Sequence, residues 1–234
     1  QQWAGKQGCL KKPVIKSISY SNTEILENIN FLYLNNKGFE LDPTYSKGNF
    51  YKDFPQPKHK SDLIPRFDDV EKADFTDLKF NDSSIESICF DPPFLFRPSK
   101  TVNNSKINQK TKFSYYQTFG DLLKNYQSAL DELHRILQPK GILAFKCQDM
   151  SDGKFNASHC EVYDMAINKF KVVDLFILLA KNRVYHSEQQ QRVARKFHCY
   201  WWVFRKKWKM RDVINSEQGS KDAWYHFHRT RNIT

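Results

Sequence analysis

The amino-acid sequence predicts an α/β protein with a mostly parallel sheet, helices on both faces and a C-terminal antiparallel hairpin. Short apolar runs alternate with segments of helical periodicity, which is the pattern of βαβ units. The last two apolar runs instead flank a polar, Gln-rich stretch, which is typical of a hairpin. With 234 residues, 40% of them hydrophobic, the chain suits a single core. We expect one domain over residues 1–206, opening with an irregular segment at 1–16, and a basic aromatic extension over 207–234.

The first half of the chain predicts one helix and two short strands. Apolar residues recur at three- and four-residue spacing in the segment 22–34, which indicates a helix: Ile25, Leu26, Ile29 and Leu32. Asn22 or Thr23 would cap its start, and residues 35–38 would end it. A strand at 38–41 then leads into a loop at 42–48. A further strand is expected at 59–64, closed by Pro65.

The second half contains the most clearly patterned elements. An apolar strand at 84–90 precedes a strong amphipathic helix at 115–137, which the sequence Pro-Lys-Gly at 139–141 would stop. In that helix we expect Tyr115 and Tyr116 to be packing residues. A strand at 142–146 and a helix at 158–169 follow. Strands at 172–180 and 196–205 would form the closing hairpin.

Basic residues exceed acidic ones, 37 Lys and Arg against 26 Asp and Glu, for a formal net charge of +11. Such an excess favours polyanionic partners through phosphate contacts and counterion release, although a basic protein without any nucleic-acid role is the alternative. The long polar stretch 95–114 contains no acidic residue, and a second basic group lies near 181–196. We expect the substrate-side contacts to come from these two stretches and from the end of the 142–146 strand: Arg97, Lys100, Lys106, Lys146, Arg192 and Arg195.

Other classes of protein receive little support. No apolar run approaches the roughly 20 residues of a membrane-spanning helix, and residues 1–12 lack the apolar core of a secretory signal. The five cysteines include no CxxC pair, so we expect reduced thiols and no metal site. These observations predict a soluble, intracellular, cytoplasmic protein.

The tetrapeptide Asp91-Pro92-Pro93-Phe94 carries the most chemical information. Two prolines cannot continue a hydrogen-bonded ladder, so the bland interpretation is a turn that ends a strand. This turn, however, follows an apolar strand at its carboxyl end, where open α/β sheets bind ligands. The sequence therefore predicts a ligand site at this position.

These residue types suit the activation of an aromatic amine. Such an amine is a poor nucleophile because its lone pair is delocalised into the ring. The carboxylate of Asp91 and the rigid carbonyl of Pro92 can both accept hydrogen bonds from the amino group, which favours a tetrahedral nitrogen. Phe94 can stack on an extruded or single-stranded base. The chemistry requires neither a covalent intermediate nor a metal.

The motif resembles the (Asp/Asn)-Pro-Pro-aromatic motif of the amino-methyltransferases, which are class I, Rossmann-like enzymes that use S-adenosylmethionine. The span from about residue 17 to 206 is similar to small phage and bacterial DNA adenine methyltransferases. Further similar pieces lie at 19–21, 39–48, 145–149 and 194–198. The resemblance implies S-adenosylmethionine as cofactor and a nucleic acid, with DNA as the first choice, as substrate. Restriction-type enzymes often carry a larger recognition domain, and its absence here predicts sequence recognition that is either short or borrowed from a partner protein or a dimer.

The resemblance also implies roles for individual residues around the cofactor. The loop after the first parallel strand would hold the methionine part, with Asp42 and Gly48 at its ends, although it has one glycine where the family pattern has two. Asp62 would accept hydrogen bonds from the ribose, and Asp74 would meet the adenine amino group beside Phe75. The full set of expected cofactor residues is Tyr20, Ser21, Asp42, Pro43, Thr44, Gly48, Asp62, Asp74 and Phe75.

Several alternatives stay open at this point. RNA adenine methyltransferases share the motif, and the contact to the 2′-hydroxyl that distinguishes RNA from DNA cannot be read from sequence. A non-catalytic nucleic-acid-binding module on the same fold is a second alternative. A methyltransferase acting on small molecules or on protein glutamine is a third, and cytosine competes with adenine as the target base. Only 16 residues separate Asp74 from Asp91, which leaves no room there for a recognition domain.

Overall fold

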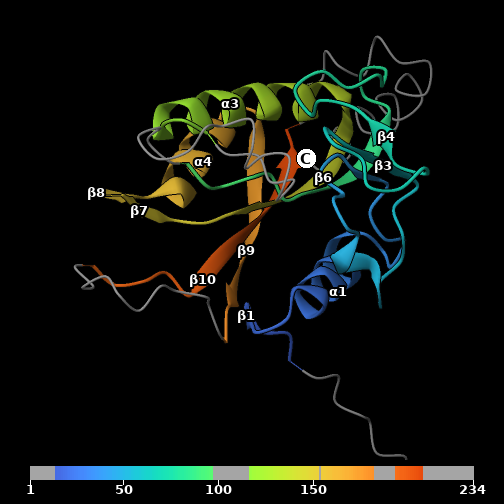
Figure 1. The fold of residues 1–234 in the computed structure, drawn as a ribbon. Helices are drawn as coiled ribbons and strands as arrows, with labels where there is room; N and C mark the ends of the chain where they lie inside the picture. The colour runs from blue at the N-terminus through green and yellow to red at the C-terminus, as the bar shows by residue number, and fades with distance from the viewer. Residues whose placement is uncertain (1–13, 97–115, 153, 182–192, 208–234) are drawn as a thin grey trace, which may run out of the picture.

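The computed structural model describes residues 14–96, 116–152, 154–181 and 193–207. Eight strands form one sheet in the order β1-β9-β10-β6-β5-β2-β3-β4, and β7 and β8 form a separate two-stranded sheet (Figure 1). In chain order the elements are β1 (Ile18–Ser19), α1 (Asn22–Tyr33), β2 (Leu41–Asp42), η1 (Asn49–Tyr51), β3 (His59–Asp62), β4 (Glu71–Lys72), β5 (Ile85–Phe90), α3 (Phe119–Ile136), β6 (Leu137–Cys147), β7 (Met150–Asp152), β8 (Lys154–Asn156), α4 (Ser158–Ala166), β9 (Phe170–Leu179) and β10 (His198–Lys206).

The large sheet is mostly parallel. β2 pairs in parallel with β3 on one side and with β5 on the other, and β5 continues in parallel to β6. Among the described strands of this sheet, only β10 runs antiparallel, to both β6 and β9, and it pairs with β9 as the C-terminal hairpin. The predicted α/β class, the mostly parallel sheet and the closing hairpin are confirmed.

Alternating side chains along the central strands build two cores, one on each face of the sheet. On β6, Leu143 and Phe145 join the core that contains α3 and α4, whereas Ile142 and Ala144 join the core that contains α1. This is the period of two that a strand imposes. Figure 1 shows α1 on one side of the sheet and α3 with α4 on the other. The predicted placement of helices on both faces is confirmed.

Several predicted boundaries are wrong, for local reasons. Ser21 caps α1 by accepting a hydrogen bond from the Glu24 N–H, in place of Asn22 or Thr23. The helix predicted over 115–137 begins at Phe119, because Thr118 and Asp121 form a capping box there. The helix predicted over 158–169 ends at Ala166, and the strand predicted over 38–41 forms only at Leu41–Asp42.

The strand predicted to begin at residue 142, after the segment 139–141, begins earlier, at Leu137. β6 begins directly after α3, with Leu137 paired to Ile85, and the ladder resumes where Ile142 pairs with Ser87. Four residues of β6, 138–141, therefore stand opposite the single residue Glu86 of β5 and form a bulge. Lys140 in this bulge has a positive φ of 67°.

Short pairings escaped prediction because they lack an apolar run. β1 and β4 have two residues each, and the β7–β8 hairpin has three residues per strand. β10 ends at Lys206, and the predicted extension beyond residue 207 lies outside the described residues. Within the described ranges, no helix combines the length and apolarity needed to cross a membrane.

Candidate active site

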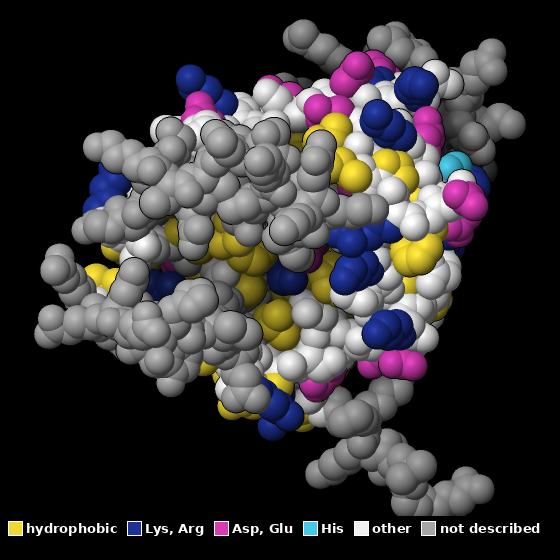
Figure 2. Space-filling model, viewed as in Figure 1, with side chains coloured by type: hydrophobic (Ala, Val, Ile, Leu, Met, Phe, Trp, Pro, Cys, Tyr) yellow, Lys and Arg dark blue, Asp and Glu magenta, His cyan; other side chains and the backbone are white. Residues whose placement is uncertain are grey.

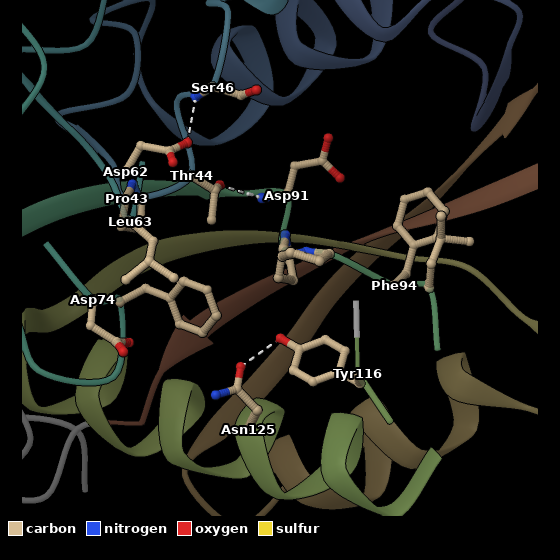
Figure 3. Close-up of a pocket in the computed structure, with 14 residues that line it drawn as sticks. Pro43, Thr44, Ser46, Asp62, Leu63, Asp74, Asp91, Phe94, Tyr116 and Asn125 are labelled. Carbon is tan, nitrogen blue, oxygen red and sulfur yellow. Dashed lines mark hydrogen bonds between the residues drawn. The ribbon is translucent and has the colours of Figure 1, made fainter. Parts of the chain in front are cut away.

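A cavity of about 290 Å³ opens at the carboxyl ends of the parallel strands (Figure 3). The chain runs from β2 outward to β3 and β4, then returns to β5 on the other side of β2 and continues to β6. Such a reversal of strand order opens a crevice in which open α/β sheets bind ligands. The cavity is lined by Pro43, Thr44, Ser46, Asp62, Leu63, Asp74, Phe75, Asp91, Pro92, Pro93, Phe94, Leu95, Tyr116 and Asn125.

The loop after β2 is held from beneath by Asp42, which is 1% exposed and does not line the cavity. One carboxylate oxygen accepts hydrogen bonds from the backbone N–H and the hydroxyl of Thr44 at 2.8 and 3.0 Å. The other accepts from the Tyr51 hydroxyl at 2.7 Å. Burial raises the pKa of Asp42 to about 7 despite these three hydrogen bonds, which lower it. Asp42 thus supports the loop from outside the cavity lining.

Gly48 closes the same loop in the left-handed region, with a φ of +64°. A Cβ atom at this position would stand 2.5 Å from the Tyr45 hydroxyl oxygen. The loop therefore needs its single glycine for the turn and for contact with Tyr45. Like Asp42, Gly48 shapes the loop without lining the cavity.

Two further acids line the cavity from β3 and from the segment after β4. Asp62 accepts hydrogen bonds from the backbone N–H groups of Ser46 and Ile64 at 2.9 and 2.8 Å, which ties β3 to the loop after β2. Asp74 accepts from the N–H and the hydroxyl of Thr76 through one oxygen. Figure 3 shows Asp62 and Asp74 on the side of the cavity opposite Phe94. Asp62 is thus fixed by its own segment and by the loop after β2, and Asp74 by its own turn.

The tetrapeptide after β5 is anchored at both ends. The Asp91 N–H donates to the Thr44 hydroxyl oxygen at 2.9 Å, which joins the tetrapeptide to the loop above Asp42. The fully buried Tyr126 of α3 donates its hydroxyl hydrogen to the Pro93 carbonyl at 3.1 Å. The segment is therefore held by the loop after β2 on one side and by α3 on the other.

The two oxygens of Asp91 have different surroundings. Oδ2 lies 3.1 Å from the ammonium nitrogen of Lys146, which is 7% exposed. Oδ1 is buried and, across the described part of the chain, is one of three buried side-chain polar atoms with no hydrogen-bond partner. A buried acceptor left in this state is costly unless a ligand supplies the donor. The site thus presents one unsatisfied acceptor.

The cavity brings together most of the residues predicted from the tetrapeptide and from the cofactor side. Four predicted cofactor residues do not line it: Tyr20 is 62% exposed, Ser21 caps α1, and Asp42 and Gly48 shape the loop after β2 from outside the lining. Of the predicted substrate-side residues, Lys146 faces Asp91 and Arg195 is exposed away from the cavity lining. The other four, Arg97, Lys100, Lys106 and Arg192, lie outside the described residues.

Sequence reasoning missed part of the lining. Tyr116, expected to be a packing residue, lines the cavity and donates to Asn125 of α3 at 2.6 Å. Its half-buried position raises the pKa of the Tyr116 hydroxyl. Asn125 could have been noticed in the sequence, because it is a polar residue next to the apolar stripe by which α3 packs on the core. Among the described residues, no group of three His, Cys, Asp or Glu side chains is placed to hold a metal ion.

Several solved structures resemble part of this chain in the path of the backbone. Family models and curated proteins gave no match. The N-methyltransferase NodS from Bradyrhizobium japonicum WM9, solved with S-adenosyl-L-homocysteine, is 13% identical over 78% of this chain and 86% of its own, with a TM-score of 0.45. The PH0226 protein from Pyrococcus horikoshii OT3 is 14% identical over 80% of this chain and 95% of its own, with a TM-score of 0.40.

A candidate DNA modification methylase from Thermus thermophilus, solved with S-adenosyl-L-methionine, is 14% identical over 60% of this chain, with a TM-score of 0.34. The chain spans 56% of the length of that protein. At this level of similarity, the fold is assigned from the strand order and layers of the chain itself.

Proposed function

We propose that this protein is an S-adenosylmethionine-dependent methyltransferase that acts on the exocyclic amino group of a nucleic-acid base, with adenine N6 in DNA as the first choice. One observation carries the proposal. The buried Oδ1 of Asp91 has no hydrogen-bond partner, and the Asp-Pro-Pro-Phe segment to which it belongs lines a cavity where the strand order reverses. A hydrogen-bond acceptor at that place suits an N–H donor beside a bound nucleotide-like cofactor.

The residues lining the cavity fit S-adenosylmethionine. Asp62 would accept hydrogen bonds from the ribose hydroxyls, and Asp74 would meet the adenine amino group next to Phe75. The loop residues Pro43 and Thr44 would border the methionine part. Open α/β sheets commonly bind nucleotides with an acid near the end of the second parallel strand, which here is β3. A carboxylate at that place accepts hydrogen bonds from the ribose.

The cofactor, when bound, would supply a methyl group on a sulfonium: the amine nitrogen would form the new C–N bond, the electrons of the C–S bond would stay on sulfur, and the proton lost from nitrogen would pass to solvent water. Asp91 Oδ1 would accept one amine hydrogen, which localises the lone pair on nitrogen. The Pro92 carbonyl would accept the other, and the adjoining prolines hold that acceptor rigid. Phe94 would stack on the base.

The nucleic-acid part of the proposal is supported by composition. The chain carries a formal charge of +11, which favours phosphate contacts. Figure 2 shows Lys and Arg interspersed with Asp and Glu on the visible face, so its described part is not uniformly basic. An RNA adenine methyltransferase is the second candidate, because the residues that would meet the base do not distinguish the two sugars.

Transfer of a labelled methyl group from S-adenosylmethionine to matched DNA and RNA oligonucleotides tests the proposal. The wild type should label DNA at adenine. Asp91→Ala should lower transfer by about 100-fold or more, because it removes the side-chain acceptor from the reacting centre. Asp131→Ala, which changes an exposed acid of α3 paired with Lys169, is the matched control and should retain activity.

Three results would contradict parts of the proposal. Normal turnover of Asp91→Ala would show that Asp91 takes no part in the reaction. Exclusive labelling of RNA would overturn the choice of DNA. Absence of transfer to any nucleic acid, with transfer to a small amine or a protein, would overturn the substrate class.

A further inference from the structure

Asp91 and Lys146 lie beside each other because of the register between β5 and β6. Phe90 pairs with Phe145 in the parallel ladder, so the next residue of each strand, Asp91 and Lys146, emerges at the same edge of the sheet. The Lys146 ammonium nitrogen then lies 3.1 Å from Asp91 Oδ2. The ion pair is therefore fixed by the sheet and does not depend on two flexible surface side chains.

Lys146 is held on its other sides by aromatic rings. Its ammonium nitrogen lies 5.0 Å from the centre of the Phe50 ring and 5.5 Å from that of Trp201. These two rings meet edge to face, with centroids 5.6 Å apart. Cation–π contacts stabilise an ammonium that has left bulk water, and they restrict where its charge can lie. A cation that is 7% exposed and so enclosed has little freedom to reach a phosphate group.

We propose that Lys146 is a positioning residue for Asp91, an inference that rests on the proposed function. Lys146 engages Oδ2 and so fixes the rotation of the carboxylate, while the Thr44 hydroxyl fixes the backbone N–H of the same residue. One oxygen, Oδ1, is left to meet the substrate. In this proposal Lys146 is not the nucleic-acid contact expected from the sequence but a residue that orients Asp91 at the reacting centre.

The ion pair also bears on the class of amine that Asp91 would accept. Lys146 balances the charge of Asp91 before any substrate arrives, so the Asp91 carboxylate itself has little net attraction for an amine that is already cationic. A neutral arylamine such as the amino group of a base needs only a hydrogen-bond acceptor, which Oδ1 supplies. We therefore expect neutral arylamines to be methylated in preference to alkylammonium substrates.

Lys146→Met tests the positioning role, because methionine keeps an apolar stem against Phe50 and Trp201 but removes the charge. We expect kcat to fall by about 10- to 100-fold, as for a misplaced catalytic group, while the KM for S-adenosylmethionine stays within about 3-fold. Lys146→Arg should recover part of the loss. Lys60→Met is the matched control, since Lys60 also pairs with a carboxylate, Asp69, and lies 5.3 Å from an aromatic ring centre, but outside the cavity lining.

A second measurement does not depend on activity. Nuclear magnetic resonance of 15N-labelled lysine should show a slowly exchanging ammonium signal that disappears in Lys146→Met and shifts in Asp91→Asn. Wild-type turnover in Lys146→Met, or an ammonium signal indifferent to Asp91→Asn, would overturn the positioning role. A wild type inactive on every nucleic acid but with the coupled ammonium signal would refute the proposed substrate and leave the ion pair established.

Discussion

Replacing Asp42 by Asn should change how the stability of the protein depends on pH. Asp42 is buried, and burial raises its pKa from 3.8 to about 7. The folded-state pKa thus lies above the unfolded one, so the stability that this group contributes is complete below about pH 4 and is lost as the pH rises through about 7. At about 1.4 kcal/mol per pKa unit, the loss is at most roughly 4 kcal/mol.

Urea unfolding of the wild type and Asp42→Asn at about pH 4 and about pH 8 measures this effect. Asn keeps an acceptor for the Thr44 N–H and does not titrate, so the wild type should lose stability relative to the variant as the pH rises. Asp69→Asn is a control of opposite sign, because the hydrogen bond from Lys60 lowers the pKa of the Asp69 carboxyl. Its contribution is present above the ordinary pKa of aspartate and is lost as the pH falls. Parallel curves for the wild type and Asp42→Asn would refute a buried carboxyl that titrates near neutrality.

Two further substitutions test the support of the site. Tyr126→Phe deprives the Pro93 carbonyl of its donor and should lower the free energy of unfolding by about 1–2 kcal/mol and reduce turnover; an unchanged melting temperature would contradict the importance of this bond. Gly141→Ala places a Cβ 2.2 Å from a Leu137 methyl carbon and 3.0 Å from the Glu86 carbonyl oxygen. It should destabilise the protein by about 1–3 kcal/mol in chemical denaturation, and a neutral effect would mean that the bulge of β6 can move.

The sheet and its covering helices were predictable because their signals are local and periodic. Ile25, Leu26 and Ile29 recur at helical spacing and do bury one face of α1. The apolar strand before Asp91 placed the tetrapeptide at the carboxyl edge without any knowledge of the neighbouring strands. Strand order, by contrast, depends on long-range pairing that a single sequence does not record.

Side-chain partners were the part that could not be predicted. Lys146 could be placed at the end of its strand, but its pairing with Asp91 follows from the register between β5 and β6, which a shift of one residue would break. The burial of Asp42 follows from the packing of Tyr51 over the loop. Tyr116 lies before α3 and not in it, because Thr118 caps the helix and α3 begins only at Phe119. The periodicity of apolar residues does not show where a helix is capped.

Calorimetric titration with S-adenosylhomocysteine tests the central claim most directly, that the cavity at the strand-order reversal is the cofactor site. The wild type should bind one equivalent, and Asp91→Asn should bind with similar affinity. Asp62→Ala, confirmed as folded by circular dichroism, should bind at least about 10-fold more weakly because a hydrogen-bonding partner of the ligand is lost. No binding by the wild type, or equal binding by folded Asp62→Ala, would contradict the account.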